Sequence, residues 1–273
     1  KQQTGGGGGT VKLLVGLADA ADVETVVIPR EERRTLCLSS QAGCAMGCRF
    51  CATAALGLKR NLEAGEMVAQ VLMGRQAALP LPLTGYVFMG MGEPLANYDR
   101  LLRALAIMTA KWGLGISARR ITVSTVGLVP QLERLAAETS VNIAVSLTAV
   151  RDDLRGRLMP INGRYPLCEL MAACRRLELP KRKRITFEYV MLKGVNDSPA
   201  DADGLVSLMR GLRVKVNLIP FNPFDGCEFS RSGDADVAAF QDRLLRADIH
   251  ASIRASRGSD IQAACGQLAA GAA

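Results

Sequence analysis

Three cysteines, Cys44, Cys48 and Cys51, follow one another with the spacing C-x3-C-x2-C. Soft thiolate ligands suit iron–sulfur clusters, which normally take four cysteines, so three thiolates could hold a four-iron cluster and leave one iron open. An open iron can chelate the amino and carboxylate groups of S-adenosylmethionine and pass an electron into its sulfonium. Homolysis of that cofactor yields a 5′-deoxyadenosyl radical, so the spacing predicts radical chemistry.

A structural zinc site is the competing interpretation, because zinc is usually held in tetrahedral sites by Cys or by Cys and His. The only histidine, His250, lies far downstream, so a Cys3His site would need a long loop closure. The chain has eight cysteines, three of them clustered, which indicates metal binding or catalysis in a reducing compartment rather than a disulfide framework. The spacing favours the cluster.

The composition is that of a globular protein with a basic surface. Of the 273 residues, 49% are hydrophobic and 22% are charged, and no apolar run approaches the roughly 18 residues that cross a bilayer. No signal peptide opens the chain, so we expect a cytoplasmic location and no membrane partner. The formal net charge of +8 favours a polyanionic partner, most simply a nucleic acid, as much as it favours a solvated basic surface.

The elements that must position the cysteines begin after a glycine-rich opening. Residues 1–10 have linker composition, and because the chain does not begin with Met we expect that an upstream part is missing. Val11–Val15 and Glu24–Ile28 read as a hairpin, which makes 11–34 an N-terminal β extension. The Ala/Gly tail at 270–273 is expected to fray.

Over 35–269, β-branched runs alternate with helical patterns. Such alternation predicts a parallel sheet with crossover helices, and the length is too short for an eight-unit barrel, so the fold class is α/β with a partial, open (β/α)6 barrel. A last strand over 249–254 and a helix over 259–269 finish the pattern. The six core strands are predicted at 35–38, 86–89, 121–124, 141–147, 185–191 and 214–219, and helices around 67–72, 101–108, 130–137, 166–178, 200–211 and 235–246.

Polar and glycine residues stand where the core strands end. Loops at the carboxyl ends of parallel strands build active sites in such folds. The glycines of Gly90-Met91-Gly92-Glu93-Pro94 allow a close backbone approach to a ligand, and Glu93 could receive an ammonium group. Each such residue alone is more often a turn residue, but their succession predicts a site. Ser124, Ser146 and Asn222 end the third, fourth and sixth strands.

Two further cysteines lie outside the triplet and near the ends of this core. Cys37 lies on the strand that leads into the cysteine loop, where it would face either the core or the mouth of the barrel. By composition alone, Cys265 is a buried cysteine of the last helix.

Seven segments resemble the RlmN/Cfr family of radical-SAM RNA adenine methyltransferases, and more closely its RlmN branch. The resemblance covers 12–267, and the pair Cys37 and Cys265 is its most specific part, because other radical-SAM families lack it. It implies that Cys44, Cys48 and Cys51 bind a [4Fe-4S] cluster. It further implies that Gly92, Glu93, Ser124, Ser146 and Asn222 bind S-adenosylmethionine. The matching segments are 35–44, 51–54, 90–95, 124–127, 187–191, 217–223 and 263–268.

The resemblance also implies a mechanism. Cys265 first receives a methyl group as a thiolate nucleophile. The adenosyl radical then takes a hydrogen atom from this S-methyl group, and the carbon radical adds to adenine C2. The family's base maps to Glu24, although composition alone would make Glu24 an exposed strand carboxylate. Cys37 attacks Cys265, and the resulting disulfide releases the methylated RNA.

Two departures affect what the resemblance implies. The family usually has His where Thr148 stands, so any imidazole contribution to cofactor binding is lost. The family's N-terminal RNA-recognition domain is expected to be absent, with only the glycine linker in its place. Ribosomal RNA is the expected substrate, transfer RNA is the second candidate, and an external electron donor is required. The alternatives are a diverged target such as C8, or a non-catalytic iron–sulfur RNA-binding paralogue.

Overall fold

One large sheet organises the part of the chain that the computed structural model describes, residues 1–6, 9–180 and 182–269. Seven neighbouring strands are parallel, because the predicted last strand joins the six core strands. The prediction of an open parallel α/β barrel is therefore confirmed. In spatial order the parallel strands are β4 (Arg33–Cys37), β7 (Gly85–Phe88), β8 (Ile121–Thr125), β9 (Asn142–Ser146), β10 (Ile185–Met191), β11 (Val214–Pro220) and β12 (His250–Ile253).

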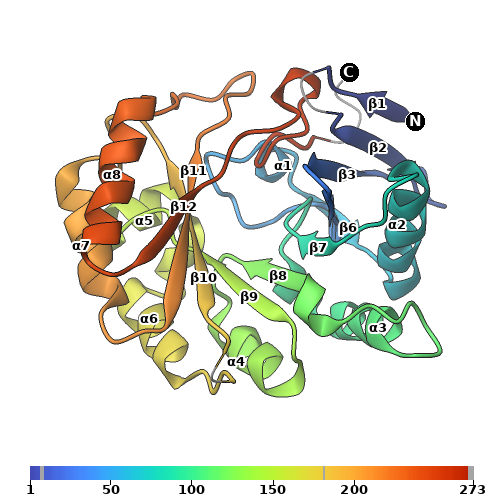
Figure 1. Ribbon diagram of the computed structural model, residues 1–273, viewed down its shortest axis with the longest axis horizontal. Helices are drawn as coiled ribbons and strands as arrows, with labels where there is room; N and C mark the ends of the chain where they lie inside the picture. The colour runs from blue at the N-terminus through green and yellow to red at the C-terminus, as the bar shows by residue number, and fades with distance from the viewer. Residues whose placement is uncertain (7–8, 181, 270–273) are drawn as a thin grey trace.

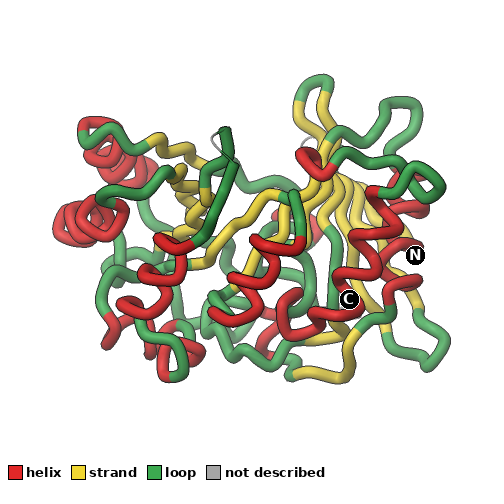
Figure 2. The backbone as a smooth tube through the Cα atoms, turned by 90° about the horizontal axis from the view of Figure 1, so that it is seen from below, coloured by secondary structure: helices red, strands yellow, loops and turns green. Residues whose placement is uncertain are grey.

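Crossover helices surround this sheet, as Figure 1 shows for α2, α3, α4, α6, α7 and α8, and Figure 2 shows the strands as one curved layer flanked by helices. The apolar residues whose spacing predicted these helices form their buried faces, for example Leu101, Leu105 and Met108 in α3. No described helix is both long and apolar enough to cross a membrane. The helices are α2 (Ala64–Ala77), α3 (Tyr98–Thr109), α4 (Val129–Glu138), α6 (Leu167–Arg176), α7 (Pro199–Met209) and α8 (Asp234–Arg246), with shorter α1 (Ala52–Ala55) and α5 (Asp152–Leu158) and single turns η1 (Pro94–Asn97), η2 (Ala118–Arg120) and η3 (Pro160–Gly163).

The N-terminal extension continues the sheet with antiparallel strands. The predicted hairpin is confirmed as β2 (Val11–Gly16) and β3 (Asp22–Arg30), and β3 pairs with β4. The expectation of a flexible linker over 1–10 is wrong for β1 (Gln2–Thr4), which pairs with β2. Polar residues suffice there because the ladder bonds are made by the backbone. The predicted tail at 270–273 lies outside the described residues.

A small hairpin that the sequence did not predict flanks the cysteine loop. Its strands are β5 (Gln41–Gly43) and β6 (Leu58–Asn61), and they are too short to show an alternating pattern. Helix α2 then begins after Glu63, whose side chain forms a capping box with Glu66.

The helix predicted over 259–269 is wrong. Only the single turn η4 (Ser259–Ile261) forms, and the chain then bends through Gln262 and Gly266, whose φ angles are 50° and 85°. Positive φ values do not continue a right-handed helix. This C-terminal segment instead runs beside α1, where Ala52 N donates to Gly266 O at 2.7 Å (Figure 1).

Candidate active site

One pocket lies at the carboxyl ends of the parallel strands and gathers nine of the residues that the sequence singled out. The cysteine loop, the ends of β8, β9 and β11, and the C-terminal segment, which runs beside the end of the cysteine loop, all line the pocket. Cys37 and Glu24 do not line it. The nine residues are Cys44, Cys48, Cys51, Gly92, Glu93, Ser124, Ser146, Asn222 and Cys265.

The cysteine loop is fixed by backbone contacts at both ends. Gly43 has a φ of 81°, and a Cβ atom there would lie 1.9 Å from the carbonyl oxygen of Gly57, so only glycine fits. Cys44 N donates to the same Gly57 oxygen at 2.9 Å, and Arg49 N donates to Leu158 O at 3.0 Å. The loop is thus attached both to the small hairpin and to α5.

The three loop cysteines suit a cationic group. Burial raises the pKa of Cys44 to about 11 and raises the pKa values of Cys48 and Cys51, and the charge of Cys51 raises those of the other two further. Neighbouring iron ions would hold such thiols as thiolates. The described residues contain no group of three or more Cys, His, Asp or Glu compact enough for a single metal ion. The three thiols line one pocket, as ligands of an iron–sulfur cluster would.

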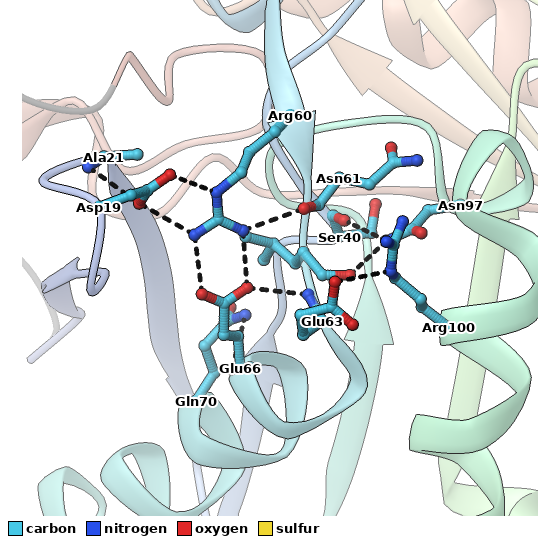
Figure 3. Close-up of polar contacts among 11 residues, drawn as sticks. Asp19, Ala21, Ser40, Arg60, Asn61, Glu63, Glu66, Gln70, Asn97 and Arg100 are labelled. Atoms are coloured by element: carbon cyan, nitrogen blue, oxygen red, sulfur yellow. Dashed lines mark hydrogen bonds and ion pairs between the residues drawn. The ribbon is translucent and has the colours of Figure 1, made fainter.

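A polar network supports the hairpin behind the loop (Figure 3). The Arg60 guanidinium on β6 lies 2.6 Å from Asp19 of the N-terminal extension and 2.8 Å from Glu66 of α2. The hydrogen bond to Arg60 lowers the pKa of Asp19 to about 2. Asn97 Nδ2 donates to Ser40 O at 2.9 Å, which attaches the residue just before β5 to η1. Three separate elements therefore hold the hairpin in place.

The glycines of the loop after β7 serve close packing of the chain on itself. A Cβ atom on Gly92, whose φ is 95°, would lie 2.5 Å from the Gln41 side chain, and one on Gly90 would lie 2.7 Å from Leu38 O. The sequence had assigned these glycines to the approach of a ligand. Gly92 does line the pocket, but the contact that requires glycine is with the strand beside it.

Glu93 is buried between two strand ends. Its carboxylate accepts hydrogen bonds from Leu95 N at 3.0 Å and Val126 N at 2.8 Å, which joins the β7 and β8 loops. Burial raises the pKa of Glu93 to about 7 even though these bonds lower it. The Thr125 side chain also hydrogen-bonds to this carboxylate, which leaves about one of its four acceptor positions for an ammonium group.

Cys265 stands on the pocket wall and not in a helix. Asn222 Nδ2 donates to Cys265 O at 3.1 Å, and Gln267 Nε2 donates to Pro223 O at 2.7 Å, so the β11 loop holds the segment. Cys265 is an exposed residue and lines the pocket. The surrounding walls still remove much of its water and raise its pKa, an effect that the nearby Arg254 opposes. The composition-based prediction of a buried helical cysteine is wrong.

Cys37 lies behind this wall, buried at the end of β4. Burial raises its pKa to about 12, and the charge of Cys265 raises it further, so the two thiols are near enough for their charges to interact. Both are free thiols.

Glu24 is buried on β3 rather than exposed. Its Oε1 lies 3.1 Å from Lys12 Nζ, and its Oε2 accepts from Ala269 N at 2.8 Å. The expectation of an exposed strand carboxylate is wrong, because the C-terminal segment covers this position.

Three notable residues were not predicted as site residues. Glu188 and Arg254 line the pocket, but each stands in a segment that the sequence predicts as a strand. Arg155 is fully buried and donates to Val126 O at 2.8 Å and to Asn162 Oδ1 at 2.9 Å.

Thr148, which stands where the family usually has His, does not line the pocket. It is buried with a φ of 58°, and its hydroxyl has no hydrogen-bond partner.

Comparison with known proteins agrees with this architecture. Residues 38–203 match the Radical SAM superfamily. The chain is 54% identical over 263 residues to the dual-specificity RNA methyltransferase RlmN of Syntrophobacter fumaroxidans, covering 96% of this chain and 77% of that protein. It is 52% identical over 260 residues to the RlmN of Geobacter sulfurreducens, covering 95% and 71%.

A solved structure is similar over nearly the whole chain. It is the crystal structure of a radical SAM methyltransferase from Sphaerobacter thermophilus, with a TM-score of 0.96 and 49% identity, covering 99% of this chain and 80% of that one. Membership of the superfamily implies a four-iron cluster and S-adenosylmethionine as cofactors, which the pocket residues suit. The chain belongs to the RlmN family of radical-SAM RNA methyltransferases.

Proposed function

We propose that this chain methylates C2 of an adenine in RNA through a methyl group carried on Cys265. The observation that supports the proposal most is the position of the Cys265 thiol, which lines the same pocket as the three loop cysteines and neighbours Cys37. A methyl carrier must meet both the radical source and the RNA. A thiol that lines the pocket beside the cysteine loop satisfies both requirements.

The cofactor-binding residues are part of the proposal. Cys44, Cys48 and Cys51 would hold the cluster, and Glu93 would accept from the ammonium group of S-adenosylmethionine. When bound, these cofactors supply a methyl group and a 5′-deoxyadenosyl radical. The remaining contacts proposed for S-adenosylmethionine are Gly92, Ser124, Ser146 and Asn222, all of which line the pocket.

The chain's own cysteines carry the methyl group. The Cys265 thiolate takes the methyl by displacement, and its S-methyl group then loses a hydrogen atom. The carbon forms a bond to adenine C2, and Glu24 would accept the proton that leaves C2. The unpaired electron left on the adduct would pass to the cluster when it is bound. The Cys37 thiolate then attacks Cys265 Sγ and breaks the carbon–sulfur bond, so that a disulfide forms and the methylene carbon on adenine takes up a proton to become the methyl group.

The substrates and partners extend the family assignment. The relatives are named dual-specificity RNA methyltransferases, and we propose ribosomal RNA and transfer RNA as the substrates of this chain. The formal net charge of +8 suits a polyanion. An external electron donor and a cytoplasmic location belong to the same proposal.

Mass spectrometry tests the central claim. The chain co-expressed with cluster-assembly proteins should carry 14 Da on the peptide containing Cys265, as one methyl replaces one hydrogen, and Cys265→Ala should carry none. Digestion and mass mapping of total RNA should then show 2-methyladenine that the variant does not produce. An unmethylated Cys265 in cluster-loaded protein would contradict the proposal. Modification at C8, or none in RNA, would favour the diverged enzyme or the non-catalytic paralogue.

A further inference from the structure

Arg155, on α5, is a buried cation that no anionic side chain contacts. Its side chain is 0% exposed, and within the described part of the chain no carboxylate lies within 4.0 Å of its guanidinium nitrogens. Burial lowers the pKa of Arg155 to about 10, so the group keeps its charge at neutral pH. A buried charge without a counter-charge destabilises a protein strongly, and an anion bound nearby would relieve that cost.

The five N–H groups of this guanidinium all donate to neutral oxygen atoms. Two of the bonds are short, because Nη2 donates to Val126 O at 2.8 Å and Nη1 donates to Asn162 Oδ1 at 2.9 Å. The other three reach the backbone oxygens of Leu147, Tyr165 and Ser146 at distances of 3.3, 3.4 and 3.4 Å. Hydrogen bonding is therefore complete, and only the positive charge lacks a partner.

Asp152 is a poor counter-charge for this guanidinium. Its Oδ1 accepts from Asn162 Nδ2 at 2.9 Å, so the Asn162 amide stands between the carboxylate and Arg155. Asp152 is also exposed, and solvent screens its charge. After burial itself, the charge of Cys48 affects the pKa of Arg155 more than the charge of Asp152 does. The guanidinium is therefore coupled most strongly to one of the three loop cysteines.

Helix α5 places Arg155 behind the cysteine loop. Cys48 is buried in one apolar cluster with Leu154 and Leu158 of this helix. Arg49 N, on the loop, donates to Leu158 O at 3.0 Å. Because Arg155 lies on the same short helix, between these two leucines in sequence, its position relative to the loop is fixed by packing and by the backbone.

The guanidinium also lies directly behind residues of the pocket. Val126 and Ser146, whose backbone oxygens accept from it, both line the pocket together with Cys48. The charge is thus one layer of backbone away from the space that the cluster would occupy. Buried charges are screened little by bulk water, so its field reaches that space.

We propose that Arg155 is the buried counter-charge of the cluster held by the three loop cysteines, and that it favours the reduced state of that cluster. A four-iron cluster on three thiolates is anionic, and uptake of one electron from the external donor adds one negative charge. A fixed cation stabilises the more negative state, and net charge is one of the factors that set cluster potentials. Arg155 is in this sense a positioning residue, which acts through the cluster and not on the RNA.

The inference rests on the proposed function, since it assumes that Cys44, Cys48 and Cys51 hold the cluster. It does not depend on methyl transfer, because reduction of the cluster can be measured without S-adenosylmethionine or RNA. It also differs from a purely structural role for Arg155, in which the side chain would only hold the ends of β8 and β9 together.

The reduction potential of the cluster tests the inference. Cluster-loaded protein without S-adenosylmethionine would be titrated anaerobically with titanium(III) citrate and followed by electron paramagnetic resonance. Arg155→Gln removes the charge and keeps hydrogen-bond donors, and its reduction equilibrium should be about tenfold less favourable, which is about 59 mV for one electron. Arg155→Lys keeps the charge and should stay within about twofold of the wild type, even if its thermal stability falls.

Two further variants complete the test. Arg157→Gln makes the same charge change at an exposed position of α5 and should titrate as the wild type does. The exchange Asp152→Asn/Asn162→Asp keeps the net charge and the Arg155 side chain, but moves a carboxylate to the atom that Nη1 contacts. It should shift the potential in the same direction as Arg155→Gln, even if Arg155→Gln folds poorly.

A wild-type potential in folded, iron-loaded Arg155→Gln would overturn the inference. Equal shifts in Arg155→Gln and Arg155→Lys would overturn it too, because they would follow from lost packing and not from lost charge. If only the exchange variant folds, an unchanged potential in that variant would have the same meaning. Failure of the proposed function would look different, because the wild type itself would then hold no four-iron cluster or carry no methyl group on Cys265.

Discussion

At the scale of single residues, the two thiols outside the cysteine loop have contrasting environments. Cys265 reaches solvent through the pocket, whereas Cys37 is buried at the end of β4. A methyl acceptor must be reached by two different reactants. A thiol that acts only on its neighbour gains from burial, because burial keeps external electrophiles and oxidants away. The contrast fits the separate roles proposed for them.

Removal of the buried thiol should stop the reaction before RNA release. In Cys37→Ala the carbon–sulfur bond between RNA and Cys265 cannot be broken, so RNA should stay covalently attached. A denaturing gel should show a slower band that ribonuclease treatment removes. Cys174→Ala, which changes another buried cysteine, should release RNA normally. A Cys37→Ala protein free of RNA would contradict the resolving role.

The release step should also depend steeply on pH. Burial raises the pKa of Cys37 to about 12, so only a small fraction is thiolate at neutral pH. A thiol below its pKa gains thiolate about tenfold per pH unit, so adduct decay in single-turnover experiments should accelerate about a hundredfold from pH 7 to 9. An ordinary thiol would level off near pH 9, and such a plateau would contradict the buried environment of Cys37.

At the scale of elements, the C-terminal segment decides where the methyl carrier stands. Ala52 N donates to Gly266 O and Thr53 Oγ1 donates to Leu268 O. Ala269 N, in the segment itself, donates to Glu24 Oε2. All three contacts come from residues more than two hundred positions earlier in the chain. The segment therefore depends on the completed sheet for its shape.

The same fact explains what the sequence could and could not predict. The apolar pattern of a strand or helix depends on which of its own residues are buried. The parallel strands and the outer helices were therefore predicted correctly. The Ala-rich run before Cys265 reads locally as a helix, but contacts with distant backbone groups override that preference. The β5–β6 hairpin is too short for a pattern, and the burial of Glu24 depends on a segment at the other end of the chain. Cys37 and Cys265 were identified by family resemblance, not by local pattern.

Lys12 and Glu24 form a buried ion pair beneath this segment, and removal of one of its two charges should destabilise the protein. Glu24→Gln leaves the Lys12 ammonium buried without a charge partner, and should lower the free energy of unfolding by about 3 kcal/mol. The double variant Lys12→Met/Glu24→Gln removes both charges and should recover most of that loss. Anaerobic urea unfolding measures both effects. Equal stability of the wild type and Glu24→Gln would show that the pair does not stabilise the segment.

At the scale of the whole molecule, the two ends of the described chain meet at the open side of the barrel. Gly6 N donates to Asp260 Oδ2 at 2.9 Å, and β3 carries the carboxylate that holds Ala269. The N-terminal strands thus extend the sheet and also support the C-terminal segment that lines the pocket (Figure 1). Segments near both ends of the described chain therefore contribute to the surroundings of the pocket.

The net charge should separate RNA binding from the first methyl transfer. Association with RNA by basic residues releases counterions, so RNA affinity measured by fluorescence anisotropy should fall at least tenfold between about 50 and 200 mM salt. Methylation of Cys265 requires only the pocket and its cofactors, and its extent by mass spectrometry should change little. Salt-independent RNA affinity would show that the charge of +8 is not used for binding.

The unequal exposure of the two thiols also sets how the enzyme would be regenerated. Each proposed turnover ends with a Cys37–Cys265 disulfide, which must be reduced before another methyl group is accepted. A reductant entering through the pocket meets the Cys265 sulfur, because Cys37 is covered. Thiol–disulfide exchange proceeds by attack on the accessible sulfur, so the mixed disulfide would form on Cys265 and Cys37 would be the leaving group. The supply of cellular dithiols would then limit how often each enzyme molecule works.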